Sequence, residues 1–199
     1  MEKLVNELNI PLEHHPWPPF IPAGAKVLIL GTFPPGDHRW SMNFYYPNRT
    51  NDFWKICGLI FLGDPYALYD QVSKRFELES IKSLMTEKRI ALNDTARTVR
   101  RLKGNASDKF LDIIEPVPLR ALLAEMPDCH SVATTGEKAA SVIAQLTHTD
   151  IPKMGSMEIS TDGLEIWRMP STSRAYPLPL EKKAEYYANM FRHLGILDG

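Results

Sequence analysis

The chain has 199 residues, of which 44% are hydrophobic and 24% charged, and its formal net charge is -1. This length is enough for one domain with a substantial core, and the composition is ordinary for a soluble globular protein. The balanced charge excludes a strongly basic chain, so any contact with nucleic acid must depend on local clusters. Cys57 and Cys129 form no CxxC pattern, which argues against a disulfide scaffold, an iron–sulfur cluster and a cysteine-based zinc site.

The sequence contains no apolar run long enough to cross a membrane, and its first residues lack the layout of a signal peptide. We therefore expect a cytoplasmic protein with no membrane partner. Residues 1–199 are predicted to form a single domain, and residues 1–25 an N-terminal extension packed on its core. A short amphipathic helix is expected over residues 1–8.

The N-terminal extension is rich in proline and must be extended or turning. Trp17 and Phe20 are expected to hold it against the core. His14 and His15 are adjacent, and neighbouring side chains of an extended segment point apart. Because no partner motif accompanies them, we predict surface histidines rather than metal ligands.

A short apolar run over residues 27–30 begins the most informative stretch of the chain. Such a run, bounded by turn residues, is typical of a fully buried strand. The strand must open into a loop, because Gly31 ends it and Pro34 and Pro35 follow. Residues 43–54 then interleave aromatic side chains with amides, which suits a pocket that stacks a flat polar ring and bonds its edge.

The remaining elements alternate between helices and strands. Helices are predicted over residues 52–61, 69–86, 108–115, 118–125, 137–144 and 180–194, and strands over residues 88–94 and 130–135. Residues 157–167 alternate in hydropathy around Asp162-Gly163, which is a strong hairpin signal. A helix start or a turn is expected over residues 95–103. The alternation predicts an α/β fold with a mostly parallel sheet.

Four strands of this predicted sheet end in polar loops, and the carboxyl ends of parallel strands share one edge. The ends are at Gly31, Asn93-Asp94, residues 134–136 and residues 169–170. This edge collects Asn43, Tyr45, Tyr46, Asn51, Asn93, Asp94, Arg97, Arg100, Arg101, Ser171, Thr172, Ser173 and Arg174. The set can stack a ring, read its edge and hold phosphate oxygens. It contains no nucleophile–base pair, metal triad or phosphate-binding glycine loop, so we expect no metal and no cofactor.

Three motifs resemble the uracil-DNA glycosylase superfamily, above all its hypoxanthine-DNA glycosylase and mismatch-specific branches. They are Gly-Thr-Phe-Pro at residues 31–34, Tyr-Tyr-x-Asn-x-x-Asn-x-Phe-Trp at residues 45–54, and Pro-Ser-Thr-Ser-x-Ala at residues 170–175. The likeness runs from about residue 26 to about residue 194. It implies a three-layer α/β/α fold around a four-stranded parallel sheet. It also implies a cofactor-free enzyme, expected to be a monomer, that hydrolyses the N-glycosidic bond of a damaged or deaminated base in DNA.

The resemblance also implies roles for individual residues. Asn51 matches the functional asparagine of the hypoxanthine branch, and its amide would orient the attacking water or form a hydrogen bond near the scissile bond. The base would be held by Gly31, Thr32, Phe33, Pro34, Tyr45, Tyr46 and Asn93. The DNA would be held by Ser171, Thr172, Ser173, Arg174, Arg97, Arg100 and Arg101, with Arg174, and Tyr176 beside it, filling the gap that the flipped nucleotide leaves.

The motifs depart from the superfamily pattern at several positions. Phe33 stands near the place where many members carry an Asp or Asn that activates water, and Met169 stands where a histidine often begins the late motif. Thr134 or Thr135 replaces an asparagine that often reads the base. These departures weaken the claim to uracil and favour a different base, slow catalysis, or a glycosylase-like fold without that activity.

Plainer explanations compete at several residues. Phe53 and Trp54 are expected in the core, and Tyr45 and Tyr46 are open between core and pocket. Asn51 alone could be a helix cap. Two other function classes stay open, namely a non-enzymatic nucleic-acid or nucleotide binder and an unrelated small-molecule enzyme.

Overall fold

The computed structural model describes residues 10–102 and 110–198, and its centre is a five-stranded sheet in the order β5-β2-β8-β10-β9. The strands are β5 (Ile90–Asp94), β2 (Val27–Gly31), β8 (Ser131–Thr135), β10 (Glu165–Met169) and β9 (Ser156–Ile159). The first four are parallel, and β9 lies antiparallel at the edge beside β10. The predicted four-stranded parallel sheet is therefore present, with one antiparallel strand added.

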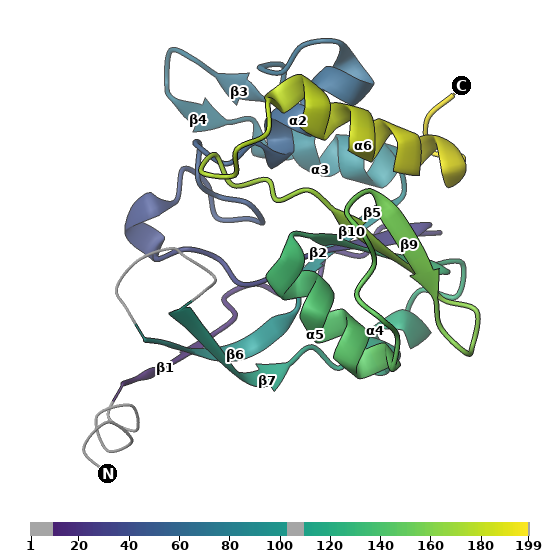
Figure 1. Cartoon of the computed structure of the whole chain (residues 1–199). Coiled ribbons are helices and arrows are strands. Elements are labelled where there is room, and N and C mark those ends of the chain that lie inside the picture. The colour runs from purple at the N-terminus through teal and green to yellow at the C-terminus, as the bar shows by residue number, and fades with distance from the viewer. Residues whose placement is uncertain (1–9, 103–109, 199) are drawn as a thin grey trace.

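Helices cover both faces of this sheet (Figure 1). One layer contains α2 (Phe53–Leu62), α3 (Leu78–Glu87) and α6 (Leu180–His193), and the other contains α4 (Leu119–Ala124) and α5 (Glu137–Thr147). Strand β2 explains the arrangement, because Val27 and Ile29 lie in one hydrophobic core while Leu28 and Leu30 lie in the other. A strand alternates its side chains with period two, so a strand that is apolar throughout needs cover on both faces. The α/β/α prediction is confirmed.

The predicted hairpin around residues 157–167 is also confirmed. Strands β9 and β10 pair antiparallel, and Gly163 in the connecting turn has φ +84°, a conformation that glycine adopts without steric cost. The predicted helices over residues 52–61, 118–125, 137–144 and 180–194 correspond to α2, α4, α5 and α6. Phe53 and Trp54 lie in the core as predicted, with at most 1% of their surface exposed.

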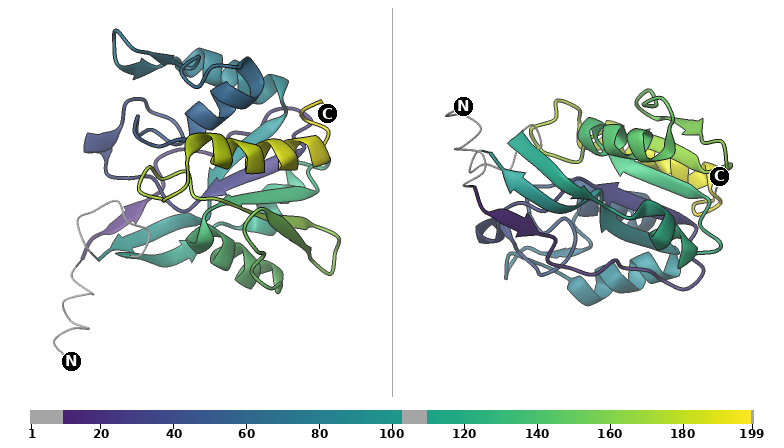
Figure 2. Two further views of the ribbon diagram at one scale, coloured as in Figure 1. Left: turned by 45° about the horizontal axis from the view of Figure 1, so that its top comes forward. Right: turned by 90° about the horizontal axis from the view of Figure 1, so that it is seen from below.

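A second, three-stranded sheet in the order β1-β6-β7 lies beside the central one (Figure 2). It contains β1 (Leu12–His14), β6 (Ala96–Arg101) and β7 (Leu111–Pro116). The predictions of a helix start or turn over residues 95–103 and a helix over residues 108–115 are therefore wrong wherever the structure describes those residues. Thr98 and Val99 are β-branched and buried, so they favour a strand once β1 and β7 offer partners on both sides.

The predicted helix over residues 69–86 is only half right. Strands β3 (Tyr69–Asp70) and β4 (Arg75–Phe76) form a small hairpin, and the helix α3 begins only at Leu78. The Asp70 carboxylate accepts hydrogen bonds from the backbone N–H groups of Val72 and Ser73. Such local side-chain to backbone bonds stabilise a turn at the expense of a helix.

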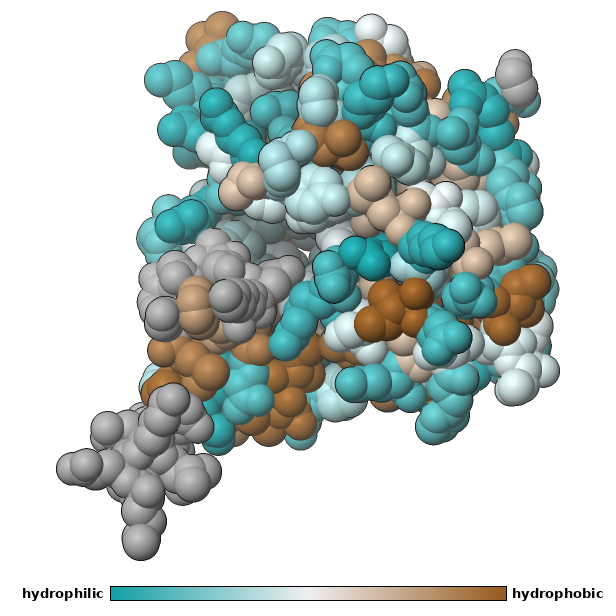
Figure 3. Space-filling view, in the orientation of Figure 1, coloured by the Kyte–Doolittle hydropathy of each residue, from teal (hydrophilic) through white to brown (hydrophobic). Residues whose placement is uncertain are grey.

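Residues 10–25 pack on the core. Phe20 forms an isolated antiparallel bridge with Leu92, and Trp17 lies against the same hydrophobic cluster. The predicted helix over residues 1–8 lies outside the described residues. Figure 3 shows apolar side chains gathered over the three-stranded sheet, where Leu12 and Ile114 are exposed. Among the described residues, no helix has the length and apolar character needed to span a bilayer.

Candidate functional site

A cavity of about 470 Å³ opens at the carboxyl edge of the parallel sheet. It contains most of the residues that the motifs single out, together with Asp94 and Thr135 from two further strand ends. Its walls are formed by Gly31, Thr32, Phe33, Pro34, Pro35, Arg39, Tyr46, Pro47, Asn48, Thr50, Asn51, Asp94, Thr135, Ser171, Thr172, Ser173, Arg174 and Ala175. Five segments of the chain therefore meet here, namely residues 31–39, 46–51, 94, 135 and 171–175.

Hydrogen bonds from β6 and the residue before it hold the end of β2 and the loop that follows, as in the bond of 3.1 Å from the N–H of Ala96 to the carbonyl of Thr32. The N–H of Thr95 donates to the carbonyl of Gly31 at 2.9 Å. The Arg101 guanidinium donates to the carbonyl of Pro34 at 3.1 Å. A Cβ on Gly31 would lie 2.5 Å from a carboxylate oxygen of Asp94, so only glycine lets that carboxylate sit against the end of β2.

Tyr46 forms one wall and is held in a strained backbone conformation, with φ +51°. Its ring stacks on Phe53 with centroids 3.9 Å apart, and its hydroxyl lies 3.2 Å from the hydroxyl of Thr135. Burial, and then the nearby charge of Asp94, raise the pKa of Tyr46 well above its usual value. The phenol is therefore neutral, and strain of this kind is concentrated at functional sites.

Asn51 lies at the start of α2 with one end of its amide engaged. The side-chain oxygen accepts a hydrogen bond from the N–H of Phe53 at 2.9 Å, which fixes the amide plane. The amide nitrogen has no hydrogen-bond partner among the described residues, although Asn51 lines the cavity. A held carbonyl and an unused N–H₂ group at the cavity wall suit a residue that donates to a ligand or a water.

A buried lysine that the motifs do not include connects two walls of the cavity. Lys183 on α6 has 1% of its side chain exposed, and its ammonium donates to the Asp52 carboxylate at 2.8 Å and to the Ser173 carbonyl at 2.9 Å. The N–H of Asp52 donates to the Thr172 carbonyl at 2.8 Å. These bonds fix the position of the late loop relative to Asn51. The only sequence signal was a lysine on the inward face of an amphipathic helix.

We expect Lys183→Met to lower the free energy of unfolding by about 3–5 kcal/mol, because it leaves the largely buried Asp52 carboxylate without its nearest cation. Urea denaturation measures this change. Lys182→Met is the matched control, since Lys182 is exposed and, among the described residues, forms a salt bridge with Glu185 alone. Equal stability losses in the two variants would contradict the role of the buried lysine.

Asp94 forms an ion pair that the sequence did not reveal. Its carboxylate lies 2.9 Å from Nε2 of His15, and each of the two side chains is only 8% exposed. The other ring nitrogen of His15 lies 2.9 Å from the carbonyl of Trp17. The prediction of a surface histidine is therefore wrong at His15, although the neighbouring His14 is exposed. The Pro-rich segment folds back over β5, and this long-range packing buries His15.

Opposing effects act on the pKa of His15. Burial lowers it, but the hydrogen bond and charge of Asp94 and the Trp17 carbonyl outweigh burial and raise it above 6.5. When the imidazole is protonated, it donates from both nitrogens, to the Asp94 carboxylate and to the Trp17 carbonyl. Asp94 therefore faces the cavity on one side and meets the ring of His15 on the other.

This pair predicts a pH dependence of stability. The folded protein holds the His15 proton more tightly than the unfolded chain does. The contribution of the pair to the free energy of unfolding is therefore complete below pH 6.5 and is lost as the pH rises through the raised pKa. We expect the stability difference between wild type and His15→Gln to be largest at low pH. The difference should shrink as the pH rises through the raised pKa of His15. Urea denaturation across pH measures it, with the exposed His38→Gln as control. A pH-independent difference would contradict the pairing.

Other predicted site residues lie outside this cavity. The Tyr45 hydroxyl bonds the side-chain oxygen of Asn93 at 3.1 Å, and both residues are buried. The three arginines do not share a helical face, because they belong to strand β6. Arg101 pairs with Glu13, Arg100 pairs with Asp112, and Arg97 is exposed. Among the described residues, no group of three or more histidine, cysteine or acidic side chains is arranged to hold a metal ion.

Comparisons with known proteins place the chain in a family. No protein-family model matches the chain. A hypoxanthine DNA glycosylase from Methanosarcina barkeri is 30% identical over 124 residues, which are 62% of this chain and 71% of that protein. The chain belongs to the hypoxanthine-DNA glycosylase branch of the uracil-DNA glycosylase superfamily. The family predicted from the sequence is thereby confirmed.

The fold of this glycosylase-family chain has a solved counterpart. The solution structure of a candidate uracil DNA glycosylase from Methanosarcina acetivorans matches with a TM-score of 0.65 and 20% identity, covering 93% of this chain and 99% of that one. At this identity the likeness concerns the fold. Two of the residues that depart from the superfamily motifs lie in different places. Met169 is buried in the core, with 1% of its surface exposed, whereas Thr135 lines the cavity.

Proposed function

We propose that the protein is a DNA glycosylase that hydrolyses the N-glycosidic bond of a deaminated base, of the hypoxanthine or uracil class, after the nucleotide has flipped out of the DNA. We propose further that it acts as a cytoplasmic monomer. The observation that supports this best is the single cavity in which Gly31, Asn51 and the Ser171 loop meet, because these are the residues that carry the family motifs. The family relationship supports the same reaction.

The cavity offers what a flipped nucleotide requires. Tyr46 presents a wall for the flat base, and the loop that follows Gly31 lines the same cavity. The Ser171 and Ser173 hydroxyls and the Arg174 guanidinium line the other side, where phosphate oxygens of the DNA strand would be held. A cavity of about 470 Å³ is within the size range of small-ligand sites.

In the proposed reaction the oxygen of a water attacks C1′ of the deoxyribose. The bond from C1′ to the base nitrogen breaks, and its electron pair leaves with the base through an oxocarbenium-like state. Asn51, with its carbonyl fixed, donates its unused N–H to the water and so orients it. The Asp94 carboxylate stabilises the developing positive charge on the sugar and accepts the proton that the water loses.

The experiment that tests this function is base release from labelled duplexes that carry hypoxanthine, uracil, xanthine or a mispair. Alkaline cleavage of the resulting abasic site reports each release. Asn51→Ala protein, purified in the same way, reveals any contaminating glycosylase. Release by the wild type identifies the base. If folded wild-type protein releases none of these bases from single- or double-stranded DNA, the proposal is wrong for this class of bases.

A further inference from the structure

A second cavity, of about 320 Å³, adjoins the first one and is not used by the proposed reaction. It lies between the start of α2, the β3–β4 hairpin and the late loop. Its walls are formed by Arg49, Thr50, Trp54, Lys55, Pro65, Tyr66, Leu68, Tyr69, Gln71, Lys74, Phe76 and Arg174. Thr50 and Arg174 also line the first cavity, so one begins where the other ends.

All the charged side chains that line this second cavity are positive. Four of the lining residues are lysines or arginines and none is acidic, in a chain whose formal net charge is -1. Arg49, Lys74 and Arg174 are exposed and make no salt bridge with any described residue. Lys55 lies 3.6 Å from Asp52, but that carboxylate is bonded more closely by Lys183. Uncompensated cations converging on a cavity attract an anion.

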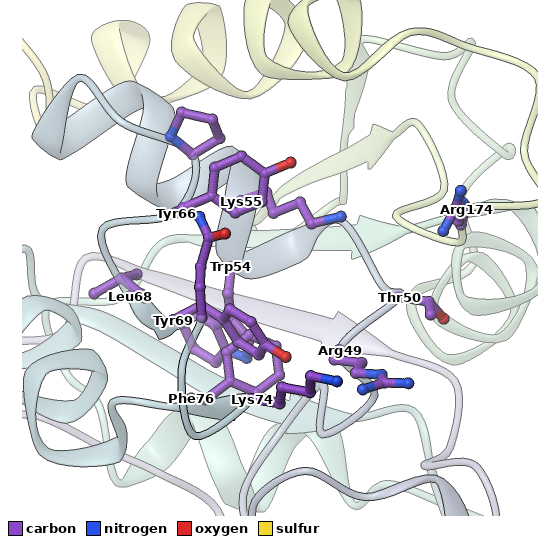
Figure 4. Close-up of a pocket in the computed structure, with 12 residues that line it drawn as sticks. Arg49, Thr50, Trp54, Lys55, Tyr66, Leu68, Tyr69, Lys74, Phe76 and Arg174 are labelled. Carbon is purple, nitrogen blue, oxygen red and sulfur yellow. The ribbon is translucent and has the colours of Figure 1, made fainter.

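Aromatic side chains also line the second cavity. Figure 4 shows the rings of Tyr69 and Phe76 near Trp54, with the charged ends of Lys55 and Lys74 on the same side of those rings. The nearby residue Tyr66 is 48% exposed.

Neither the Tyr66 nor the Tyr69 hydroxyl has a hydrogen-bond partner among the described residues. Tyr69 packs on Phe76, whereas the exposed Tyr66 offers a stacking face beside the cations.

We propose that this second cavity binds the nucleotide that adjoins the flipped one on the same DNA strand. Its base stacks on the Tyr66 and Tyr69 side, and its phosphate is held by Arg49 and Lys74. Arg174, at the boundary of the two cavities, contacts the phosphate between the two nucleotides. This inference rests on the proposed function, because it takes the substrate to be a DNA strand. Aromatic faces beside cations bind single-stranded nucleotides with little regard to sequence.

The test measures binding without base release. The probe is a single-stranded oligonucleotide with a tetrahydrofuran abasic analogue, which has no base to excise, and fluorescence anisotropy reports affinity. Lys74→Gln removes one charge from the cavity. Arg75→Gln is the matched control, because Arg75 is the next residue of the same hairpin, is exposed and does not line the cavity. Tyr66→Ala removes the exposed ring.

We expect Lys74→Gln and Tyr66→Ala each to weaken binding by about tenfold and Arg75→Gln to have little effect. In Lys74→Gln, the slope of log affinity against log salt concentration should fall by about one, the value for one lost phosphate contact. We then compare two shortened oligonucleotides, each ending at the analogue on one side. The two variants should bind as tightly as wild type to the one that lacks the adjoining nucleotide of the second cavity, and more weakly than wild type to the other. That asymmetry is the signature of a subsite for one adjoining nucleotide.

The proposal is overturned if wild type does not bind the probe, if both variants bind like Arg75→Gln, or if their losses are the same for both truncated oligonucleotides. Its failure is distinct from that of the proposed function. The tetrahydrofuran probe reports on the subsite even if no base is ever released. Conversely, if the wild type releases a base and Lys74→Gln binds the probe as tightly as the wild type, the glycosylase function stands and the subsite is excluded.

Discussion

Asn51→Ala is expected to slow base release under single-turnover conditions by about 100- to 1,000-fold, the usual effect of removing one preorganised polar group from a reacting centre. The reason is geometric, because the Phe53 N–H fixes the amide plane and leaves the nitrogen available at the cavity wall. The binding of DNA should change little, since phosphate contacts come from other residues.

A second substitution separates this role from helix capping. Asn51→Ser retains an oxygen that can accept the Phe53 N–H, so the helix start and the stability should be preserved. We expect it to be as inactive as Asn51→Ala, since a hydroxyl does not replace the amide N–H₂. Urea denaturation measures the stability of both variants. If the serine variant regained wild-type activity, Asn51 would be a cap and no more.

Asp94→Asn is expected to lower the single-turnover rate by about 100-fold or more, because the amide neither accepts a proton nor stabilises a cationic sugar. The substitution keeps the volume beside Gly31 and leaves an oxygen for His15. The affinity for DNA should be unchanged or higher, since a carboxylate facing a polyanion is repulsive. Base release and fluorescence anisotropy on the same duplex measure the two effects.

The control for this substitution is Asp37→Asn, which removes one negative charge from the exposed short 3-10 helix Asp37–Arg39 in the segment that follows the Gly31 loop. It should leave the rate close to wild type. A wild-type rate in Asp94→Asn would exclude the carboxylate from the reaction. Parallel losses of rate and of DNA affinity would instead indicate that the substitution disturbs the site as a whole.

Much of the architecture could be predicted from local patterns. The apolar run that begins at Val27 predicted a buried strand ending at Gly31, and Asp162-Gly163 predicted a hairpin. The structure contains both. Period-two burial, amphipathic helices and turn residues are properties of neighbouring residues, so they can be read without knowing the fold. The family motifs likewise placed Asn51 and the Ser171 loop at one sheet edge, where the structure has them.

Local patterns failed where the backbone choice depended on distant partners. The spacing of Arg97, Arg100 and Arg101 fits a helix, but the edges of β1 and β7 were available to pair with this segment as a strand. Hydrogen bonding along both edges outweighed a spacing that carries little energy by itself. The same argument applies to the β3–β4 hairpin, where turn bonds of Asp70 displaced the first turns of a predicted helix.

By itself, the sequence determined the α/β class, the strand ends that meet at one edge, and the family motifs that line a cavity there. Only the tertiary structure decided which charges face one another. His15 meets Asp94 across 79 positions of the chain, and Lys183 meets Asp52 across 131. Neither pair leaves a periodic mark in the sequence, because a buried ion pair depends on where two separate segments pack together and not on the residues beside either partner.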